Sequence, residues 1–284
     1  MAWMEEFRTL LRTQQSRVRL AVVCLAFALP LFGFSDNSVD VHTIIERSVQ
    51  ANNADWNQAP EYDYFETDRN VQGTKTLHVM MIQGSPYERL VAVNEMPLPA
   101  DKEQAEQYKL EQAIAARQKE SPRQRAQRVA KYERDRKRDH LLMEQLTDAF
   151  DFKLQGTQKL GPHEVYLLQA RPRAGYQPPN SQAKVLTGME GQLWIDTKTY
   201  QWVKVEAIVV HPVSIVGILA RVEPGTRFEL ENVRVAENVW LPRHFAMKAS
   251  AKVLMLFNHN QQEDETYFNY HKAEPSQTLS SMGK

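Results

Sequence analysis

Apolar residues recur at helical spacing near residue 41. Ile44, Ile45 and Val49 follow Val41 at i+3, i+4 and i+8, so the four side chains fall on one face of a helix. A pair of asparagines follows at 52–53, and this residue type favours helix ends. The pattern predicts a short amphipathic helix that opens the domain.

After Pro60 the apolar residues follow the pattern of strands. Residues 62–71, 75–83 and 87–94 are rich in aromatic and β-branched side chains, and short glycine-containing turns separate them. Neighbouring strands joined by short turns pair in opposite directions. The three segments predict an antiparallel meander.

Residues 100–149 interrupt the strands with a long polar segment. They contain almost no glycine and many Glu, Gln, Lys, Arg and Ala residues, which favour helix. Ser121 fits an N-cap and Pro122 the first position of a second helix. We therefore expect a charged helical hairpin inserted into the sheet.

Strand patterns return after Phe150 and continue almost to the last residue. Turn residues separate them at a spacing of about 8–12 residues, and roughly ten or eleven strands result, enough for an antiparallel sheet to curl. The predicted fold class is α+β, with a strongly curved antiparallel sheet, a leading helix and the inserted helical hairpin. The segments are 152–154, 164–170, 192–196, 201–211, 227–235, 240–251, 252–257 and 266–271.

One face of the strand over residues 201–209 is apolar throughout. Val203, Val205 and Ala207 alternate there with polar or aromatic neighbours, and side chains two apart share a face of a strand. A curved sheet concentrates such a face on its concave side. We expect Leu193, Ile195, Val203, Val205 and Ala207 to share this apolar face and line the concavity, with ordinary core packing as the alternative.

The connection over residues 211–225 is apolar, although connections are usually polar. It contains Ile215, Ile218 and Leu219, with Gly217 and Gly225 nearby. Either this segment plugs the open side of the sheet as core, or it forms a movable lip over an apolar pocket. In the second case the three apolar residues would contact the ligand in that pocket.

The first 35 residues have the pattern of an export signal. Arginines precede an uncharged apolar stretch over residues 20–34, which is shorter than the roughly 20 residues that span a bilayer. Gly33 and Ser35 are small, as signal cleavage requires. We expect a signal over residues 1–35, a single domain over 36–284 with the hairpin inserted at about 100–150, and a periplasmic location. An uncleaved inner-membrane anchor is the alternative.

Composition and charge exclude several classes of protein. Cys24, the single cysteine, lies within the signal, so the exported domain has no thiol for catalysis or metal binding. The chain balances 35 Lys and Arg against 35 Asp and Glu, so it has no global basic field to attract nucleic acid.

Catalytic motifs are missing as well. The histidines have no zinc-site spacing, and no glycine-rich phosphate loop is found. Ser85 lacks the second glycine of a nucleophile elbow, and the S-x-x-K match at Ser181–Lys184 lacks its companion motifs in order. We expect no enzyme activity, no metal and no cofactor.

Residues 123–138 form a cationic stretch, with eight basic residues against two acidic ones. Such a stretch is either a solvated helix face or a contact surface for anionic lipid headgroups or an acidic protein partner. Each basic residue near an anionic membrane contributes about 1 kcal/mol. The contact residues under the second interpretation are Arg123, Arg125, Arg128 and Lys131.

A set of short motifs in fixed order follows the Pro122 break. It comprises Asp148-Ala149-Phe150-Asp151-Phe152, Gly175-Tyr176-Gln177-Pro178-Pro179, Leu193-Trp194-Ile195-Asp196, Tyr200-Gln201-Trp202-Val203-Lys204-Val205, Leu219-Ala220-Arg221-Val222-Glu223-Pro224-Gly225 and Val239-Trp240-Leu241-Pro242. The order resembles an exported bacterial family related to the outer-membrane lipoprotein-sorting (LolA/LolB-like) superfamily.

The resemblance implies a half-open β-barrel around a hydrophobic cavity that helices partly close, and it brings no catalytic motif. We expect a non-catalytic periplasmic carrier of lipid or lipoprotein acyl chains. The residues that would contact the acyl chain are Leu193, Ile195, Val203, Val205, Ala207, Ile215, Ile218 and Leu219. The alternative is an envelope sensor or scaffold that binds a protein partner through the sheet and the cationic hairpin. A carrier needs a dry, continuous cavity, whereas a scaffold can fill that space with its own side chains.

Overall fold

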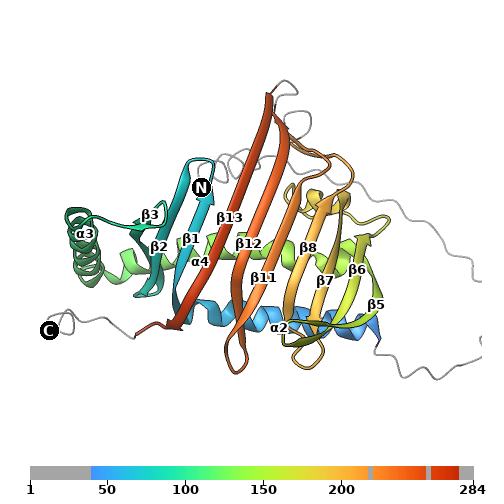
Figure 1. Cartoon of the computed structure of the whole chain (residues 1–284), viewed down its shortest axis with the longest axis horizontal. Coiled ribbons are helices and arrows are strands. Elements are labelled where there is room, and N and C mark those ends of the chain that lie inside the picture. Colours follow the sequence, from blue (N-terminus) through green and yellow to red (C-terminus); the bar gives the residue numbers. More distant parts are fainter. Residues whose placement is uncertain (1–39, 217–219, 254–256, 275–284) are drawn as a thin grey trace, which may run out of the picture.

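A computed structural model describes residues 40–216, 220–253 and 257–274. The predicted export signal, Ile218 and Leu219 lie outside these ranges. Within them the chain is α+β, with a large antiparallel sheet in front of two long helices (Figure 1). No helix of the described ranges is both long and apolar enough to cross a membrane.

The secondary structure follows the predicted order of elements. The helices are α2 (Val41–Gln58), η1 (Ala59–Glu61), α3 (Ala100–Gln118), α4 (Pro122–Glu144), α5 (Leu146–Ala149) and η2 (Ala183–Gly188). The strands are β1 (Tyr62–Asn70), β2 (Gly73–Ile82), β3 (Ser85–Val93), β4 (Met96–Pro97), β5 (Phe150–Leu160), β6 (His163–Pro172), β7 (Met189–Asp196), β8 (Trp202–Val209), β9 (Val213–Val216), β10 (Ala220–Val222), β11 (Arg227–Ala236), β12 (Val239–Val253) and β13 (Phe257–Lys272).

The strands form one antiparallel sheet that stays open. Its order is β4-β3-β2-β1-β13-β12-β11-β8-β7-β6-β5, and β10 joins β12 to β9 beside this path. β1 pairs with both β2 and β13, so the first and last strands meet inside the sheet. β4 and β5 end the order without pairing with each other. The predicted α+β fold with a curved, half-open antiparallel sheet is confirmed.

Helix α2 is longer than the sequence pattern predicts. Asp40 caps its start by accepting a hydrogen bond from the main-chain nitrogen of Thr43 at 3.3 Å. The predicted end at residues 52–53 is wrong, because Asn52 donates from Nδ2 to the oxygen of Ser48 and stays within the helix. The helix ends just before Pro60, which cannot donate the next helical hydrogen bond.

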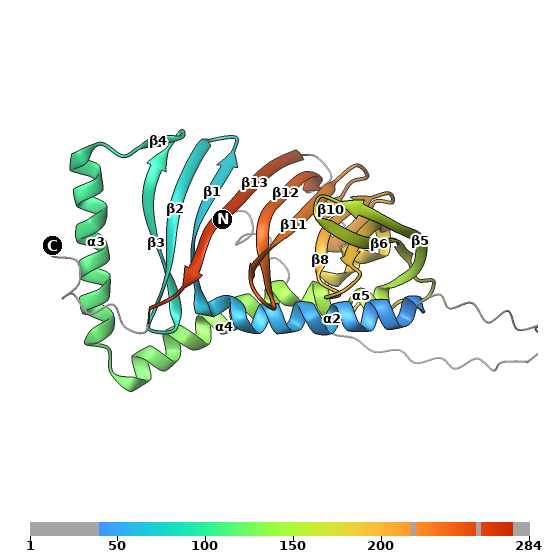
Figure 2. The same ribbon diagram turned by 60° about the horizontal axis from the view of Figure 1, so that its bottom comes forward.

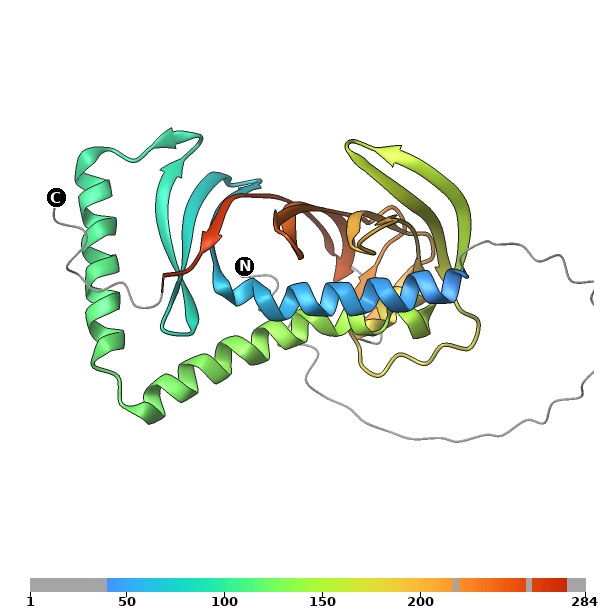
Figure 3. The ribbon, with the colours of Figure 1, turned by 90° about the horizontal axis from the view of Figure 1, so that it is seen from below.

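The two charged helices do not form a hairpin. The break falls at Ser121 and Pro122 as predicted, but α3 and α4 diverge from it (Figure 2). α3 packs at the edge of the sheet, where Leu110 and Ile114 contact Met80 and a neighbouring isoleucine of β2. α4 instead runs beside α2 below the sheet (Figure 3). The prediction of paired helices is wrong because each helix buries its few apolar residues against the sheet or α2.

The main core lies between α2 and one face of the sheet. Ile44 and Ile45 of α2 pack there against strands β5–β8, β9 and β10 and against η2. We call this set the core cluster. Its members are Ile44, Ile45, Ala149, Phe150, Leu168, Ala170, Ala183, Leu186, Met189, Leu193, Ile195, Trp202, Val209, Ile215 and Val222.

A buried carboxylate fixes the other end of α2. Asp55 is 5% exposed, and its Oδ1 accepts hydrogen bonds from the main-chain nitrogen of Trp240 at 3.0 Å and from Nε2 of Gln201 at 3.3 Å. Burial disfavours the charged form and outweighs these two hydrogen bonds, so it raises the pKa of Asp55 from 3.8 to about 7. α2 is therefore held by apolar contacts near its start and by polar contacts near its end.

The Asp55→Asn variant keeps the shape of the side chain and its Oδ1 acceptor but removes the ionisable carboxyl group. In the wild type this carboxyl group loses its proton near pH 3.8 in the unfolded chain and near pH 7 in the folded chain. The stability that Asp55 contributes is therefore complete at low pH and is lost as the pH rises to 7. The free energy of unfolding of the variant minus that of the wild type should rise across this window by at most about 4 kcal/mol.

Urea titrations at about pH 4 and pH 8 measure this difference. Asp148→Asn makes the same change at an exposed position and should leave the difference constant. A constant difference for Asp55→Asn as well would contradict the raised pKa of the buried carboxyl group.

Candidate functional site

A β-bulge redirects the side chains of β8. Trp194 lies opposite Lys204, whereas its neighbour Ile195 lies opposite Trp202, so Val203 is the extra residue. A bulge switches the faces on either side of it. Trp202 consequently joins the core cluster, and Val203 packs with Trp194 on the other face. The prediction that Val203 lines the apolar cavity face is wrong for this reason.

The other described residues predicted to line a cavity share the face of the core cluster. Leu193, Ile195 and Ile215 belong to the cluster and are 5%, 0% and 2% exposed. Val205 and Ala207 pack against it and are partly buried. The space at the three buried residues is thus filled by the protein's own side chains, and Ile215 on β9 acts as core.

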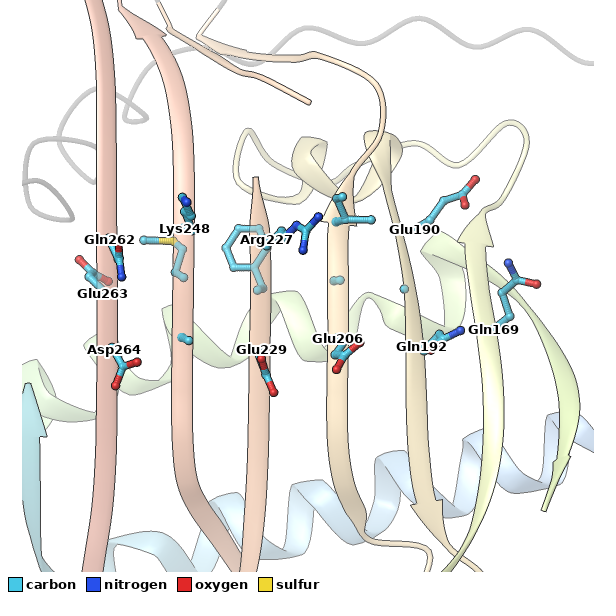
Figure 4. Close-up of a pocket in the computed structure, with 16 residues that line it drawn as sticks. Gln169, Glu190, Gln192, Glu206, Arg227, Glu229, Lys248, Gln262, Glu263 and Asp264 are labelled. Carbon is cyan, nitrogen blue, oxygen red and sulfur yellow. The ribbon is translucent and has the colours of Figure 1, made fainter. Parts of the chain in front are cut away.

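A pocket of about 530 Å³ lies against the middle of the sheet. Its 16 lining residues come from β6, β7, β8, β11, β12 and β13, and the labelled ones extend from Gln169 to Gln262 (Figure 4). The volume is within the range of about 300–1,000 Å³ that small-molecule sites have. The lining residues form three adjacent rows across the strands.

The middle row is mostly apolar. Gly191 lies opposite Ala207, Ala207 opposite Phe228, and Phe228 opposite Met247. We call these four residues the middle row. Ala207 and Phe228 pack against the core cluster, so the row continues the apolar face of the sheet. A Cβ at residue 191 would lie 2.6 Å from the oxygen of Glu206, which explains why this position is glycine.

The two outer rows are charged and project to the opposite face, because neighbouring residues of a strand alternate. They include Glu206, Glu229, Arg227 and Lys248 (Figure 4). Beside them, Nζ of Lys204 lies 2.8 Å from Glu206 and 2.7 Å from Glu229. Burial lowers the pKa of Lys204, but these two hydrogen bonds outweigh it and the pKa is raised. Most of the lining residues belong to these outer rows, so the pocket presents a mainly polar and charged surface.

Sequence reasoning missed a group of tyrosines and carboxylates on β1 and β13. Glu66 lies opposite Tyr267, whose ring centroid is 5.9 Å from that of Tyr64 and whose hydroxyl donates to Glu265. Burial, reinforced by nearby carboxylates, raises the pKa of Glu66 to about 8, so its side chain is largely protonated at neutral pH. No local pattern could reveal this group, because it depends on pairing between the first and last strands.

The cationic stretch is divided between structural and exposed residues. Arg128 is half-buried and donates to Glu120 at 2.6 Å, to Oγ of Ser85 at 2.6 Å and to the oxygen of Gln83. The prediction that Arg128 contacts headgroups or a partner is therefore wrong, since it ties α4 to the turn between β2 and β3. The predicted residues that remain exposed are Arg123, Arg125 and Lys131, the last paired with Asp135 at 2.9 Å.

The described residues contain no group of three or more His, Cys, Asp and Glu side chains arranged to hold a metal ion. Polar pairs do occur, such as His163 with Asp196 at 3.1 Å, where turn amides also bind the carboxylate. These contacts support the turn after β7.

No protein-family model matches the chain, and no protein of curated function matches it. Among solved structures, a LolA superfamily protein from Nitrosomonas europaea has 9% identity and a TM-score of 0.31, with 84% of this chain and 96% of that chain covered. A domain described as an outer membrane lipoprotein-sorting protein from Vibrio parahaemolyticus has 12% identity and a TM-score of 0.30, with 83% and 96% covered.

The MucA/MucB complex of Pseudomonas aeruginosa also matches, at 9% identity and a TM-score of 0.22, with 80% of this chain and 99% of that chain covered. The superfamily named in the first of these matches is the one that the sequence motifs resemble. At such TM-scores and identities the likeness carries no functional argument.

Arg128→Ala should destabilise the protein, because it removes a half-buried guanidinium and leaves Glu120 and the Gln83 oxygen without this donor. Hydrogen bonds to charged groups contribute about 1.5–3 kcal/mol, so a loss of this order is expected in urea unfolding. Arg123→Ala is the matched control and should change stability by less than about 0.5 kcal/mol. Equal effects of the two variants would contradict the structural role of Arg128.

Proposed function

We propose that this protein is a non-catalytic carrier of the bacterial envelope that holds an acyl chain of a lipid or lipoprotein. The observation that supports it is the middle row, which continues the apolar face of the sheet across β7, β8, β11 and β12. The small side chain of Ala207 leaves room there, and Phe228 and Met247 offer apolar contact surface.

The energy of such binding suits a carrier. Each buried methylene contributes about 0.8 kcal/mol, so a chain of about 16 carbons gives roughly 12 kcal/mol before other terms. Association costs about 4–15 kcal/mol, which offsets much of this gain. The small net free energy of binding that remains permits both uptake and release of the acyl chain.

The carrier would act in the periplasm, where the predicted signal over residues 1–35 would send it. Arg123 and Arg125 lie at the exposed start of α4 and would face anionic headgroups when the protein meets a membrane. Lys131 would contribute less, because Asp135 already pairs with it.

A second candidate is a scaffold that binds a protein partner on the charged face of the sheet. Two observations favour it: the core cluster fills the space beneath α2, and the outer rows carry Glu206, Glu229, Arg227 and Lys248 on the face turned away from that cluster. An interface of this kind would be polar and sensitive to salt.

The test is to purify the protein from a bacterial periplasm and measure bound lipid by native mass spectrometry and organic extraction. Ala207→Phe places a ring in the middle row and should lower the bound lipid about tenfold by filling the space for the chain. Thr157→Phe adds a ring at an exposed position of β5 and is the control.

Two further results separate the candidates. Reversing Glu206 and Glu229 to lysine should leave lipid uptake unchanged if the carrier proposal holds, because both side chains project to the other face. A wild-type protein that stays free of lipid after incubation with phospholipid vesicles and acylated peptide would overturn the carrier and favour the scaffold.

A further inference from the structure

A second cavity lies at the far end of the sheet, away from the middle row. It has a volume of about 760 Å³ and lies between α2, α5 and the beginning of β5. We call it the edge groove. Its lining residues are Asp40, Val41, His42, Ile45, Glu46, Val49, Gln50, Thr147, Asp148, Asp151, Phe152 and Arg173.

The floor of the edge groove is apolar. Ile45 is 4% exposed and belongs to the core cluster, whereas Val41, Val49 and Phe152 are partly buried and pack against that cluster. A hydrophobic side chain entering the groove would therefore contact a surface that the core already holds in place.

The rim of the edge groove is acidic. Four carboxylates line it, with one guanidinium, that of Arg173, as the only Lys or Arg side chain in the lining. Arg173 donates from Nε to Asp151 at 2.8 Å and from Nη2 to the oxygen of Phe150 at 2.9 Å. Its positive charge is therefore already paired within the wall of the groove. Asp148 is exposed and has no ion pair within the described part of the chain. The rim favours a ligand with positive charge.

The groove adjoins a free strand edge. β5 is the last strand in the sheet order and pairs with β6 alone among the described strands. The outer edge of such a strand carries main-chain N–H and C=O groups without strand partners, which can pair with an added strand. Asp151 and Phe152 belong both to β5 and to the lining of the groove.

From this combination we propose that the edge groove binds an extended peptide segment of a protein partner, with alternating apolar and basic side chains. The main chain of the peptide would pair with the outer edge of β5, one apolar side chain would rest on Ile45, Val49 and Phe152, and Lys or Arg side chains would meet Asp148 and Glu46. This site is separate from the middle row and does not depend on the acyl-carrier proposal.

The experiment measures fluorescence anisotropy of a fluorescein-labelled (Lys-Val)4 peptide with the full-length protein at low salt. Binding should weaken at least about tenfold when Glu46→Lys and Asp148→Lys are combined, because both reverse the charge of the rim. A (Glu-Val)4 peptide should bind at least about tenfold more weakly than (Lys-Val)4. Amide hydrogen exchange within residues 150–160 should slow when the peptide is bound.

The matched control combines Glu103→Lys and Glu237→Lys, which make the same change of charge at exposed positions of α3 and of the turn after β11. This variant should bind (Lys-Val)4 as the wild type does. Absence of binding to the wild type, equal loss in the control, or binding without slower exchange in β5 would each overturn the proposal. Far-ultraviolet circular dichroism checks that both double variants are folded.

Discussion

The structure depends on how one helix covers the apolar face of a sheet that does not close. A closed barrel shields its inner face with its own strands, but here β4 and β5 end the sheet without meeting. α2 supplies the missing cover. Ile44 and Ile45 bury apolar surface near its start, and Asp55 accepts hydrogen bonds from β12 and from Gln201 near its end. Because the pKa of Asp55 is about 7, the polar end of this cover changes charge near neutral pH, whereas the apolar end does not.

The bulge in β8 gives the two faces of the sheet different chemistry. It turns Trp202 inward and Val203 outward, so that an aromatic ring completes the core where a regular strand would have placed a smaller side chain. Beyond the bulge the alternation is regular, with the middle row on one face and Glu206, Glu229, Arg227 and Lys248 on the other. A ligand that binds across β7, β8, β11 and β12 therefore meets mainly apolar side chains on one face and mainly charged ones on the other.

The strands and helices could be predicted from the sequence because their signals are local: alternation over a few residues, and a serine and proline at the break before α4. The face on which Val203 lies could not be predicted from the sequence, because Trp202 and Val203 are both apolar and either fits the interior. The role of Arg128 was hidden for a similar reason, since a basic residue on a polar helix has the same pattern whether it faces solvent or the turn at Ser85. Asp55 accepts a hydrogen bond from Trp240, 185 positions away in the sequence. The surroundings of Glu66 depend on the pairing of β1 with β13. Contacts between residues so far apart in the sequence produce no local pattern of hydrophobic and polar residues.

The pairing of β1 with β13 also constrains when the fold can form. The described chain begins at α2 and β1, yet one edge of β1 finds its partner only when β13, the last strand, is available. Such distant contacts slow folding, because a long loop must close before the contact gives any gain. During synthesis the early strands β1 to β3 would have an edge without its partner strand, which exposes them to aggregation. The protein is therefore expected to fold late and as one unit, and a chaperone that shields strand edges would have most effect on it before its last segment emerges.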